Sequence, residues 1–364
     1  MVKASLYFHF PFCTRKCPYC HFYVVRNKNH DPFLKALLKE WEMHRPQIEN
    51  KEIVSLYFGG GTPTLFIEGI EAILKRIGAP EMTVETNPED VTPQLMKKLR
   101  DLGINRVSIG VQSFNNSLLK HLGRSHTAQT AIDAVEITRN AGIENIAIDL
   151  MYELPYQTLE RWEQTVDKAC SLPIAHLSLY NLTFEPHTAF KKKEPELRPH
   201  LPDQETATAM LSSAIARFEK AGLKRYEISA FARNDRISVH NSGYWTGRPF
   251  LGYGPSAFSY WEGKRFQNVC RMNKYNDSLA AGTFPIAFEE KLSPLSSLHE
   301  KIAVGLRLTA GISVPNIPLS TQQLLHELDR EGWLTYTYDR AHVKLTEKGA
   351  LFYDTVAERI ILLP

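Results

Sequence analysis

The first half of the chain alternates short, nearly continuous apolar runs with longer amphipathic segments. Continuous apolar runs of four to eight residues predict buried strands, because both faces of a parallel strand are covered by other elements. The amphipathic segments predict helices that lie on such a sheet. The predicted strands are Ser5–Phe10, Val54–Gly60, Met82–Thr86, Arg106–Ser113, Ile146–Tyr152 and His176–Leu182.

Capping residues mark where the predicted helices begin. Helix starts are predicted at Asp31, which precedes a proline, at Thr92, which also precedes one, and at Thr127 and Thr158. Six units of strand and helix, at intervals of roughly 25–40 residues, predict parallel βαβ architecture of the α/β class. Such units form either a partial or full barrel or an open doubly wound sheet. In each case ligands bind at the carboxyl ends of the strands.

The alternation ends near residue 185, and the chain is expected to continue in two further parts. Residues 186–203 are polar and rich in proline, which predicts a long loop, and a helix ending at Gly222 and a loop rich in glycine and aromatic residues follow. Two β-like runs joined by "DRAH", preceded and followed by helices, predict a winged-helix-like module. We therefore expect a barrel core at 1–185, a barrel extension at 186–290 and a C-terminal winged-helix-like domain at 291–364.

Composition excludes some classes of protein. The 364 residues are 43% hydrophobic and 23% charged, as in ordinary globular proteins, and no apolar run is long enough to cross a bilayer. The formal net charge is only +3, and the last 70 residues hold both signs without a basic stripe, so no nucleic-acid partner is expected. No secretory signal is evident at the amino terminus, which predicts a reducing cytoplasmic location.

Three cysteines, Cys13, Cys17 and Cys20, lie together in the sequence "FHFPFCTRKCPYCHFY" after the first predicted strand. A structural zinc site needs four ligands, and only His9 and His21 are near enough in sequence to supply a fourth. Disulfides are disfavoured by the odd number and by the reducing compartment. An iron–sulfur cluster with one iron left open fits three thiolates, and that open iron could bind a ligand.

A run of three glycines, Gly59 to Gly61, follows the second predicted strand in the sequence "FGGGTPT". Glycine permits unusual dihedrals and a close approach of the backbone to a ligand. By itself the run indicates no more than a tight turn. At the carboxyl end of a strand next to the cysteine loop, it is also suited to holding a cofactor.

Together, the C-x3-C-x2-C loop and the "GGGTP" turn resemble the radical S-adenosylmethionine (SAM) superfamily. The resemblance covers the whole chain and implies a partial (β/α)6 barrel. It implies a 4Fe-4S cluster on Cys13, Cys17 and Cys20, with SAM bound at the open iron. The other cofactor-binding positions that it implies are Tyr7, Gly60, Gly61, Thr62, Glu85, Gln112, Arg124, Asp149 and Thr183. Glu85 and Asp149 could instead be a solvated strand end or a helix cap, but their placement at strand ends in a glycine-rich site favours ligand binding. For Arg124 and Thr183 a purely structural role remains an alternative.

Within the superfamily the chain resembles oxygen-independent coproporphyrinogen III oxidases and the related HemW-type haem chaperones. The oxidases have a further cysteine where this chain has Phe22, and a long amino-terminal arm that this sequence does not show. The sequence "HNSGYW", from His240 to Trp245, matches the HN-x-x-YW motif of the chaperones. The resemblance implies that His240 binds haem iron. The alternative is that His240 and Asn241 cap a turn while the aromatic residues are buried.

The resemblance to the chaperones implies a cytoplasmic radical SAM protein that binds haem and delivers it to acceptor haem proteins, including respiratory ones at the membrane. It also implies an electron donor protein and a homodimer, and it leaves enzymatic activity open. The first alternative is an oxygen-independent coproporphyrinogen III oxidase, which forms protoporphyrinogen IX by oxidative decarboxylation in porphyrin biosynthesis. The second is a binding protein with zinc at the cysteines and a nucleic-acid contact in the C-terminal module.

Overall fold

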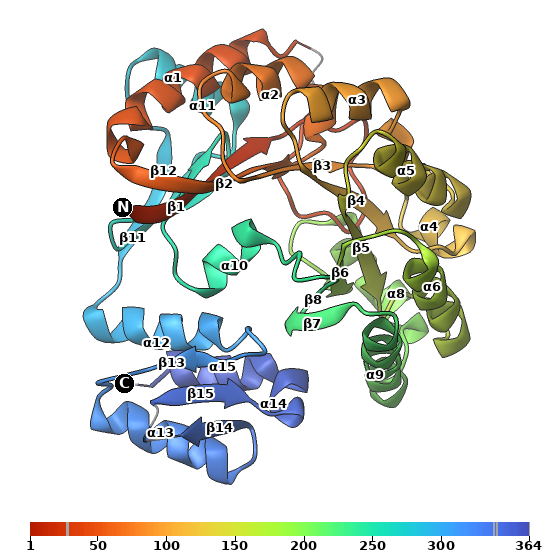
Figure 1. Ribbon diagram of the computed structural model, residues 1–364, viewed down its shortest axis with the longest axis vertical. Helices are drawn as coiled ribbons and strands as arrows, with labels where there is room; N and C mark the ends of the chain where they lie inside the picture. Colours follow the sequence, from red (N-terminus) through yellow and green to blue (C-terminus); the bar gives the residue numbers. More distant parts are fainter. Residues whose placement is uncertain (27–28, 338, 340, 364) are drawn as a thin grey trace.

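The computed structural model describes residues 1–26, 29–337, 339 and 341–363. Its centre is a curved sheet of six parallel strands in sequential order, with helices on the outer face (Figure 1). The fold is therefore of the α/β class, with the (β/α)6 arrangement of a partial barrel. The strands are β1 (Val2–Phe10), β2 (Lys51–Gly60), β3 (Glu81–Thr86), β4 (Arg106–Gln112), β5 (Asn145–Tyr152) and β6 (His176–Asn181).

The helices of this core follow the strands in turn. Their bounds are α1 (Asp31–Ile48), α2 (Ile67–Leu74), α3 (Pro93–Asp101), α4 (Asn116–His121), α5 (Ala128–Asn140) and α6 (Leu159–Ser171), with 3-10 turns η1 (Pro63–Leu65) and η2 (Pro88–Asp90). Thr92, Thr127 and Thr158 are N-caps whose side chains accept backbone N–H bonds, as predicted. The prediction for α1 was wrong by one position. Asp31 is the first helical residue and His30 is the N-cap.

The sheet continues beyond the core at both edges, so that among the described residues it has twelve strands. Next to β6 lie β8 (Ala230–Ala232) and β7 (Lys224–Glu227), and next to β1 lie β9 (Phe250–Tyr253), β10 (Phe258–Trp261), β11 (Lys264–Asn268) and β12 (Ile286–Lys291). The helices of this part are α9 (Gln204–Lys220) and α11 (Met272–Ala280). The glycine- and aromatic-rich region predicted as a loop therefore contains short strands.

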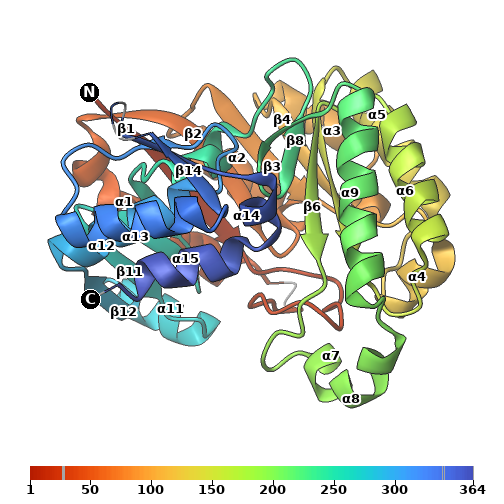
Figure 2. The same cartoon turned by 90° about the horizontal axis from the view of Figure 1, so that it is seen from below.

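Residues 186–203 are likewise not the long loop that the sequence predicts. They form two short helices, α7 (Ala189–Lys192) and α8 (Glu194–Leu197), and a 3-10 turn η3 (Arg198–His200). Each piece is too short to show helical periodicity, and prolines lie in the first turn of the second and third pieces, which explains the wrong prediction. Figure 2 shows these helices beside the carboxyl end of β6.

A short helix, α10 (Val239–Trp245), lies across the amino-terminal end of the barrel (Figure 1). The Glu81 carboxylate at the start of β3 accepts hydrogen bonds from the backbone N–H of Val239 (2.9 Å) and His240 (2.7 Å). These bonds satisfy donors of the first helical turn, which have no partner within the helix. Glu81 therefore fixes α10 to the sheet.

The C-terminal domain has its own small core and lies beside the open side of the barrel (Figures 1 and 2). Its three-stranded antiparallel sheet and helices give the expected winged-helix-like arrangement. The elements are α12 (Pro294–Gly305), β13 (Ile312–Ser313), α13 (Leu319–Arg330), β14 (Leu334–Thr337), β15 (His342–Leu345), α14 (Glu347–Leu351) and α15 (Tyr353–Ile361). The predicted "DRAH" turn includes Arg340, which lies outside the described residues.

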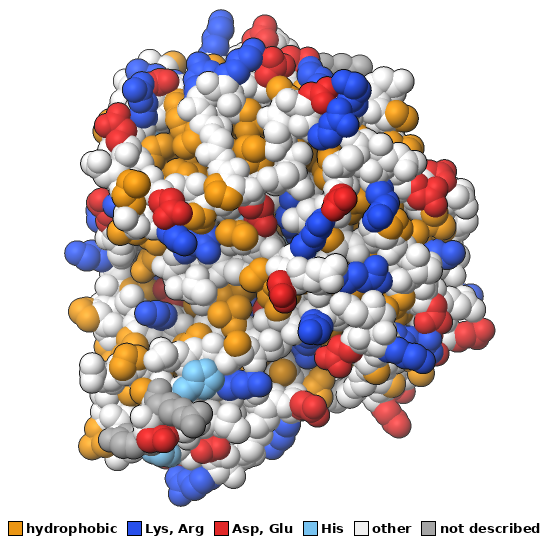
Figure 3. Space-filling model, viewed as in Figure 1, with side chains coloured by type: hydrophobic (Ala, Val, Ile, Leu, Met, Phe, Trp, Pro, Cys, Tyr) orange, Lys and Arg blue, Asp and Glu red, His pale blue; other side chains and the backbone are white. Residues whose placement is uncertain are grey.

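The main core lies between the sheet and the helices on its outer face. Phe8 on β1 stacks between Phe58 on β2 and Tyr253 on β9, with ring centroids 5.2 and 4.8 Å away, so β9 shares one aromatic layer with the core strands. On the face of the molecule in Figure 3, basic and acidic side chains are interspersed. Among the described residues, none of the helices combines the length and apolar character of a bilayer-spanning segment.

Candidate active site

The cysteine loop leaves the carboxyl end of β1 and returns to it. Cys13 N–H donates to Val25 O (3.1 Å), Val25 N–H donates to Pro11 O (2.6 Å), and Phe12 and Val25 form an isolated parallel bridge. Backbone hydrogen bonds therefore hold the start of the loop, at Pro11 to Cys13, against its end at Val25. Between them Cys20 N–H donates to Cys17 O (3.1 Å), which forms a turn and brings the second and third cysteines close in space.

A cavity of about 430 Å³ lies at the carboxyl ends of the strands, where the fold predicts ligand binding. All three cysteines of the loop line it. Eight further positions predicted from the sequence also line it: Gly60, Gly61, Thr62, Glu85, Gln112, Arg124, Asp149 and Thr183. The structure thus brings eleven of the thirteen predicted site residues together.

The three thiols are partly buried and form no disulfide with any described cysteine. Burial raises the pKa of Cys13 to about 11, and burial also raises the pKa of Cys20. A metal would therefore displace protons when it binds these sulfurs. Among the described residues, no three His, Cys, Asp or Glu side chains are close enough together to hold a single metal ion. A 4Fe-4S cluster fits this donor set, because each thiolate then binds a different iron.

The two histidines considered as a fourth zinc ligand, His9 and His21, contact other residues than the three cysteines. His9 is buried, and its ring nitrogens lie 3.2 Å from the Tyr7 hydroxyl and 3.2 Å from Tyr23 O. His21 is exposed and stacks on Phe22, with ring centroids 4.5 Å apart. Phe22, two positions after Cys20, lines the cavity.

Two glycines hold the β2 turn against the cysteine loop. Gly61 N–H donates to Phe10 O (2.8 Å), and Thr62 N–H donates to Phe12 O (2.7 Å). A Cβ at Gly61 would lie 2.5 Å from Phe12 O, so no other residue fits there without moving the backbone. Gly60 has a φ of 102°, and its added Cβ would meet the ring of His9. The glycine run is therefore required by close backbone packing at the cavity.

Two carboxylic acids form the floor of the cavity. Glu85 accepts a hydrogen bond from the Tyr57 hydroxyl (2.8 Å) and another from the backbone N–H of Gly60 (3.0 Å). Burial raises the pKa of Glu85 to about 7, despite these two bonds. Burial likewise raises the pKa of Asp149 to about 6. Both acids can accept hydrogen bonds from the ammonium or hydroxyl groups of a ligand.

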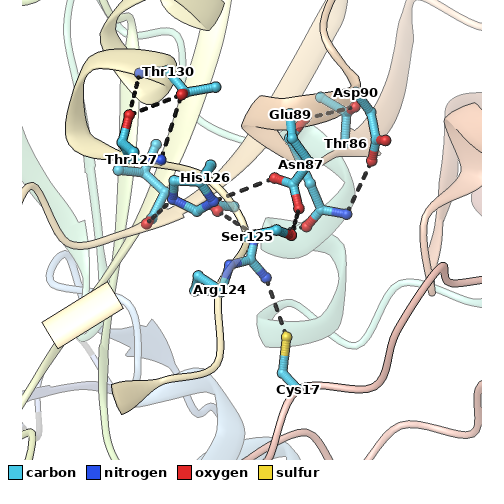
Figure 4. A network of polar contacts seen from close by, with 12 residues as sticks. Cys17, Thr86, Asn87, Glu89, Asp90, Arg124, Ser125, His126, Thr127 and Thr130 are labelled. Atoms are coloured by element: carbon cyan, nitrogen blue, oxygen red, sulfur yellow. Dashed lines mark hydrogen bonds and ion pairs between the residues drawn. The ribbon is translucent and has the colours of Figure 1, made fainter. Parts of the chain in front are cut away.

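Arg124 extends into the same cavity and contacts a cysteine (Figure 4). Its Nη1 donates to Cys17 Sγ at 3.5 Å, while Nη2 donates to Asn87 Oδ1 (2.7 Å) and to Gly110 O (2.8 Å). Its Nε is buried and has no hydrogen-bond partner among the described residues. Arg124 therefore retains a donor for a bound anion.

Tyr7 and His240 are the two predicted residues that do not line the cavity. His240 is 1% exposed, and its ring nitrogens lie 3.0 Å from Ser55 Oγ and 2.9 Å from the Tyr244 hydroxyl. Burial lowers the pKa of His240 to about 3, so the imidazole is neutral. Tyr7 lies between the two regions, since its ring centroid is 6.4 Å from that of His240 and its hydroxyl meets His9.

Sequence reasoning did not single out several residues of the cavity, among them Asn87 and Glu89 in the "NPED" turn after β3. The available signal was that "NPED" follows a strand at the predicted ligand edge. Nothing in the sequence indicated that Asn87 would contact Arg124, which lies 37 positions later.

Comparisons with known proteins agree with this geometry. The family model of the radical SAM superfamily matches residues 7–169. A protein named heme chaperone HemW from Bacillus subtilis is 35% identical over 320 residues, which cover 85% of this chain and 84% of that protein. Another of the same name from Lactococcus lactis is 34% identical over 377 residues, with 98% and 97% covered.

The fold has a close relative among solved structures. Coproporphyrinogen III oxidase (HemN) from Escherichia coli, described as a radical SAM enzyme, superposes with a TM-score of 0.86 over 99% of this chain and 90% of that one. The sequences are 22% identical, so this likeness concerns the fold. The sequence matches are stronger and extend over most of both chains. This chain belongs to the radical SAM superfamily and, within it, to the HemW family.

Proposed function

We propose that this protein is a radical SAM haem chaperone. It holds a 4Fe-4S cluster on Cys13, Cys17 and Cys20, binds SAM at the open iron, binds haem and delivers it to acceptor haem proteins. The observation that carries the proposal is the cavity in which three thiols with no fourth cysteine meet Gly60, Gly61 and two carboxylic acids. The HemW relatives support the haem part.

The residues of the cavity have separate roles in this proposal. When bound, the cluster supplies a one-electron centre with an open iron for the amino acid part of SAM. Glu85 accepts a hydrogen bond from the ligand ammonium group, and the free Nε–H of Arg124 donates to its carboxylate. The backbone at Gly60 and Gly61 lets the ligand approach closely. Asp149 is placed to accept from ligand hydroxyl groups.

Haem needs a site of its own, because a cluster and SAM together fill much of a 430 Å³ cavity. His240 is the residue that we propose for this haem site and that the experiment below replaces. In the proposal Nε2 of His240 would hold the haem iron, which would require the Tyr244 hydroxyl to move away from that nitrogen. Acceptor haem proteins, an electron donor protein and a homodimer belong to the same proposal.

Anaerobic reconstitution with iron and sulfide, followed by parallel assays, tests this function. We expect the wild-type protein to contain about four irons per chain, to retain haem through gel filtration, and to form no protoporphyrinogen from coproporphyrinogen. His240→Ala should lose the haem absorption band. Tyr244→Phe, which keeps the imidazole and removes only its partner, should retain it. Formation of protoporphyrinogen would replace the chaperone proposal with the oxidase. Zinc without iron or sulfide would overturn both.

A further inference from the structure

One polar network connects two of the three cysteines. Thr62 Oγ1 lies 3.4 Å from Cys13 Sγ, and Arg124 Nη1 donates to Cys17 Sγ at 3.5 Å. Asn87 joins these contacts, because its Nδ2 donates to Thr62 Oγ1 (2.9 Å) and its Oδ1 accepts from Arg124 Nη2 (2.7 Å). Figure 4 shows Asn87 and Arg124 above Cys17.

The direction of each hydrogen bond in this network is determined by its neighbours. Asn87 Nδ2 also donates to Asp90 Oδ2 (3.2 Å), which fixes the amide with its oxygen toward Arg124. The Thr62 hydroxyl accepts from Asn87 and still has its own proton to donate. When Cys13 is a thiolate ligand its Sγ can only accept, so both cysteine sulfurs then accept a hydrogen bond, one from the Thr62 hydroxyl and one from the Arg124 guanidinium.

Arg124 makes no direct contact with a carboxylate of the described residues, although the charge of Glu89 acts on it from nearby. No ion pair among the described residues includes Arg124. The nearby Glu89 instead accepts a hydrogen bond from Ser125 Oγ, and its Oε2 lies 3.3 Å from His126 Nδ1. The other ring nitrogen of His126 lies 3.1 Å from Val111 O. Glu89 is therefore held by Ser125 and His126 rather than by the guanidinium of Arg124 (Figure 4).

A buried guanidinium without a carboxylate partner is costly unless another anion lies beside it. The thiolate ligands of a cluster supply that anion at Cys17. The cluster becomes one unit more negative on reduction, so a fixed positive charge and hydrogen bonds to its sulfurs favour the reduced form.

We propose that Asn87 is a positioning residue for the cluster ligands, which holds Arg124 on Cys17 and Thr62 on Cys13 and thereby raises the reduction potential of the cluster. This inference rests on the proposed function, because it requires the cluster on these cysteines. Arg124 and Thr62 contact the cysteine sulfurs directly. Asn87 does not contact a sulfur but holds Arg124 and Thr62 in place. One electron enters the oxidised cluster from an external reductant, and no bond is formed or broken in the protein.

The test is a redox titration of reconstituted protein without SAM, with the reduced cluster measured by electron paramagnetic resonance. Arg124→Met removes both a fixed positive charge and a charge-assisted hydrogen bond to Cys17 Sγ. We therefore expect Arg124→Met to lower the ratio of reduced to oxidised cluster at a fixed potential at least tenfold, which is about 59 mV for a one-electron couple. Asn87→Ala should shift the ratio in the same direction by severalfold. Arg124→Lys, which keeps the charge, should recover part of the loss.

Asn105→Ala is the matched control. Asn105 also uses both ends of its amide, with Nδ2 donating to Pro80 O (2.7 Å) and Oδ1 accepting from Met82 N–H (2.9 Å), but it lies at the amino end of β4, away from the cysteines. This variant loses two side-chain hydrogen bonds, against three in Asn87→Ala, and its cluster should titrate like the wild type. A shift as large as that of Asn87→Ala would mean a general effect of destabilisation and would overturn the inference.

Iron and sulfide analysis separates the possible failures. If Asn87→Ala does not assemble a cluster, Thr62→Val, which leaves Arg124 in place, tests the same network and should lower the ratio. If the wild-type protein assembles a cluster but the reduction potential is unchanged in Arg124→Met and in Thr62→Val, this inference is overturned and the proposed function stands. Wild-type protein that assembles no cluster would overturn the proposed function itself.

Discussion

At the scale of single residues, the cavity depends on how closely the backbone of β2 approaches the cysteine loop. Gly61 and Thr62 donate to Phe10 O and Phe12 O, immediately before Cys13. A side chain at position 61 would push these carbonyl groups away, and Cys13 would move with them. The glycine is therefore a structural requirement of the proposed cluster site.

Gly61→Ala should consequently destabilise the protein and reduce cluster loading. The added Cβ would lie 2.5 and 2.7 Å from two backbone oxygens, which no side-chain rotation can relieve. We expect a loss of about 1–3 kcal/mol in the free energy of unfolding, as for other overpacked sites. Urea denaturation and iron content after reconstitution measure the two effects.

The control for this substitution is Gly78→Ala. Gly78 is exposed, its φ is not positive, and an added Cβ meets no heavy atom within 4 Å. This variant should be as stable as the wild type or slightly more so, because alanine restricts the unfolded chain. Equal iron content in the two variants would contradict the role given to Gly61.

At the scale of elements, helix α1 carries a buried glutamic acid whose hydrogen bonds connect the helix to three other segments of the fold. Glu40 is 0% exposed, and it accepts hydrogen bonds from Gly254 N–H (2.8 Å), Asn268 Nδ2 (2.6 Å) and the Tyr275 hydroxyl (2.5 Å). Burial raises the pKa of Glu40 to about 7, although these bonds oppose the rise. Glu40 thereby connects α1 to the turn after β9, to β11 and to α11.

This elevated pKa makes stability depend on pH. The folded state binds the proton of Glu40 more tightly than the unfolded state, so its contribution is fully present below about pH 4.5 and is lost as pH rises through 7. Between pH 5 and 8.5 the free energy of unfolding of the wild type should fall relative to that of Glu40→Gln by about 2 kcal/mol. Urea denaturation at both pH values measures this difference. Glu42→Gln, an exposed neighbour on α1, should show no such change.

The elements that the sequence predicts correctly are those with a strong local pattern. The six core strands are continuous apolar runs, and three of the helix starts have threonine caps, so each could be recognised alone. By contrast, β7 to β10 have three or four residues each, and the two pairings that attach them to the core, β8 with β6 and β9 with β1, join segments far apart in sequence. Tertiary contacts rather than periodicity determine such strands.

The same distinction applies to the site. Cys13, Cys17 and Cys20 and the glycine run are adjacent in sequence and carry a recognisable spacing. Asn87 belongs to the site only because β3 and β4 place it beside Arg124, and single-sequence reasoning has no access to that contact. His240 illustrates the reverse case. Its motif is recognisable, but the structure buries the ring under Ser55 and Tyr244, outside the cavity lining.

At the scale of the whole molecule, one arginine connects the C-terminal domain to the barrel. Arg307, after α12, lies 4.3 Å from the ring centroid of Trp245 on α10 and 5.2 Å from that of Tyr353 on α15. Its Nη2 donates to Glu227 Oε2 (3.2 Å) and Ser229 Oγ (3.0 Å) near β7 and β8. Four elements therefore meet at this side chain.

Arg307→Met should weaken the connection between the two domains. It removes both cation–π contacts and leaves Glu227, which is 4% exposed, without its partner, so we expect a loss of about 3 kcal/mol in the free energy of unfolding. Limited trypsin digestion should cut sooner near residues 291–293, between β12 and α12. Arg236→Met, which breaks an exposed ion pair with Glu144, should cost less than about 1 kcal/mol. Equal losses in the two variants would contradict this role.

The pairing of Phe12 with Val25 has a consequence for the life of the protein in the presence of oxygen. The backbone bonds that close the cysteine loop involve no sulfur, so none of them depends on the proposed inorganic centre. If that centre is oxidised and lost, we expect the polypeptide to keep its three thiols on a tethered segment at the rim of the barrel. Iron and sulfide should then be restored in place, without unfolding or new synthesis of the chain.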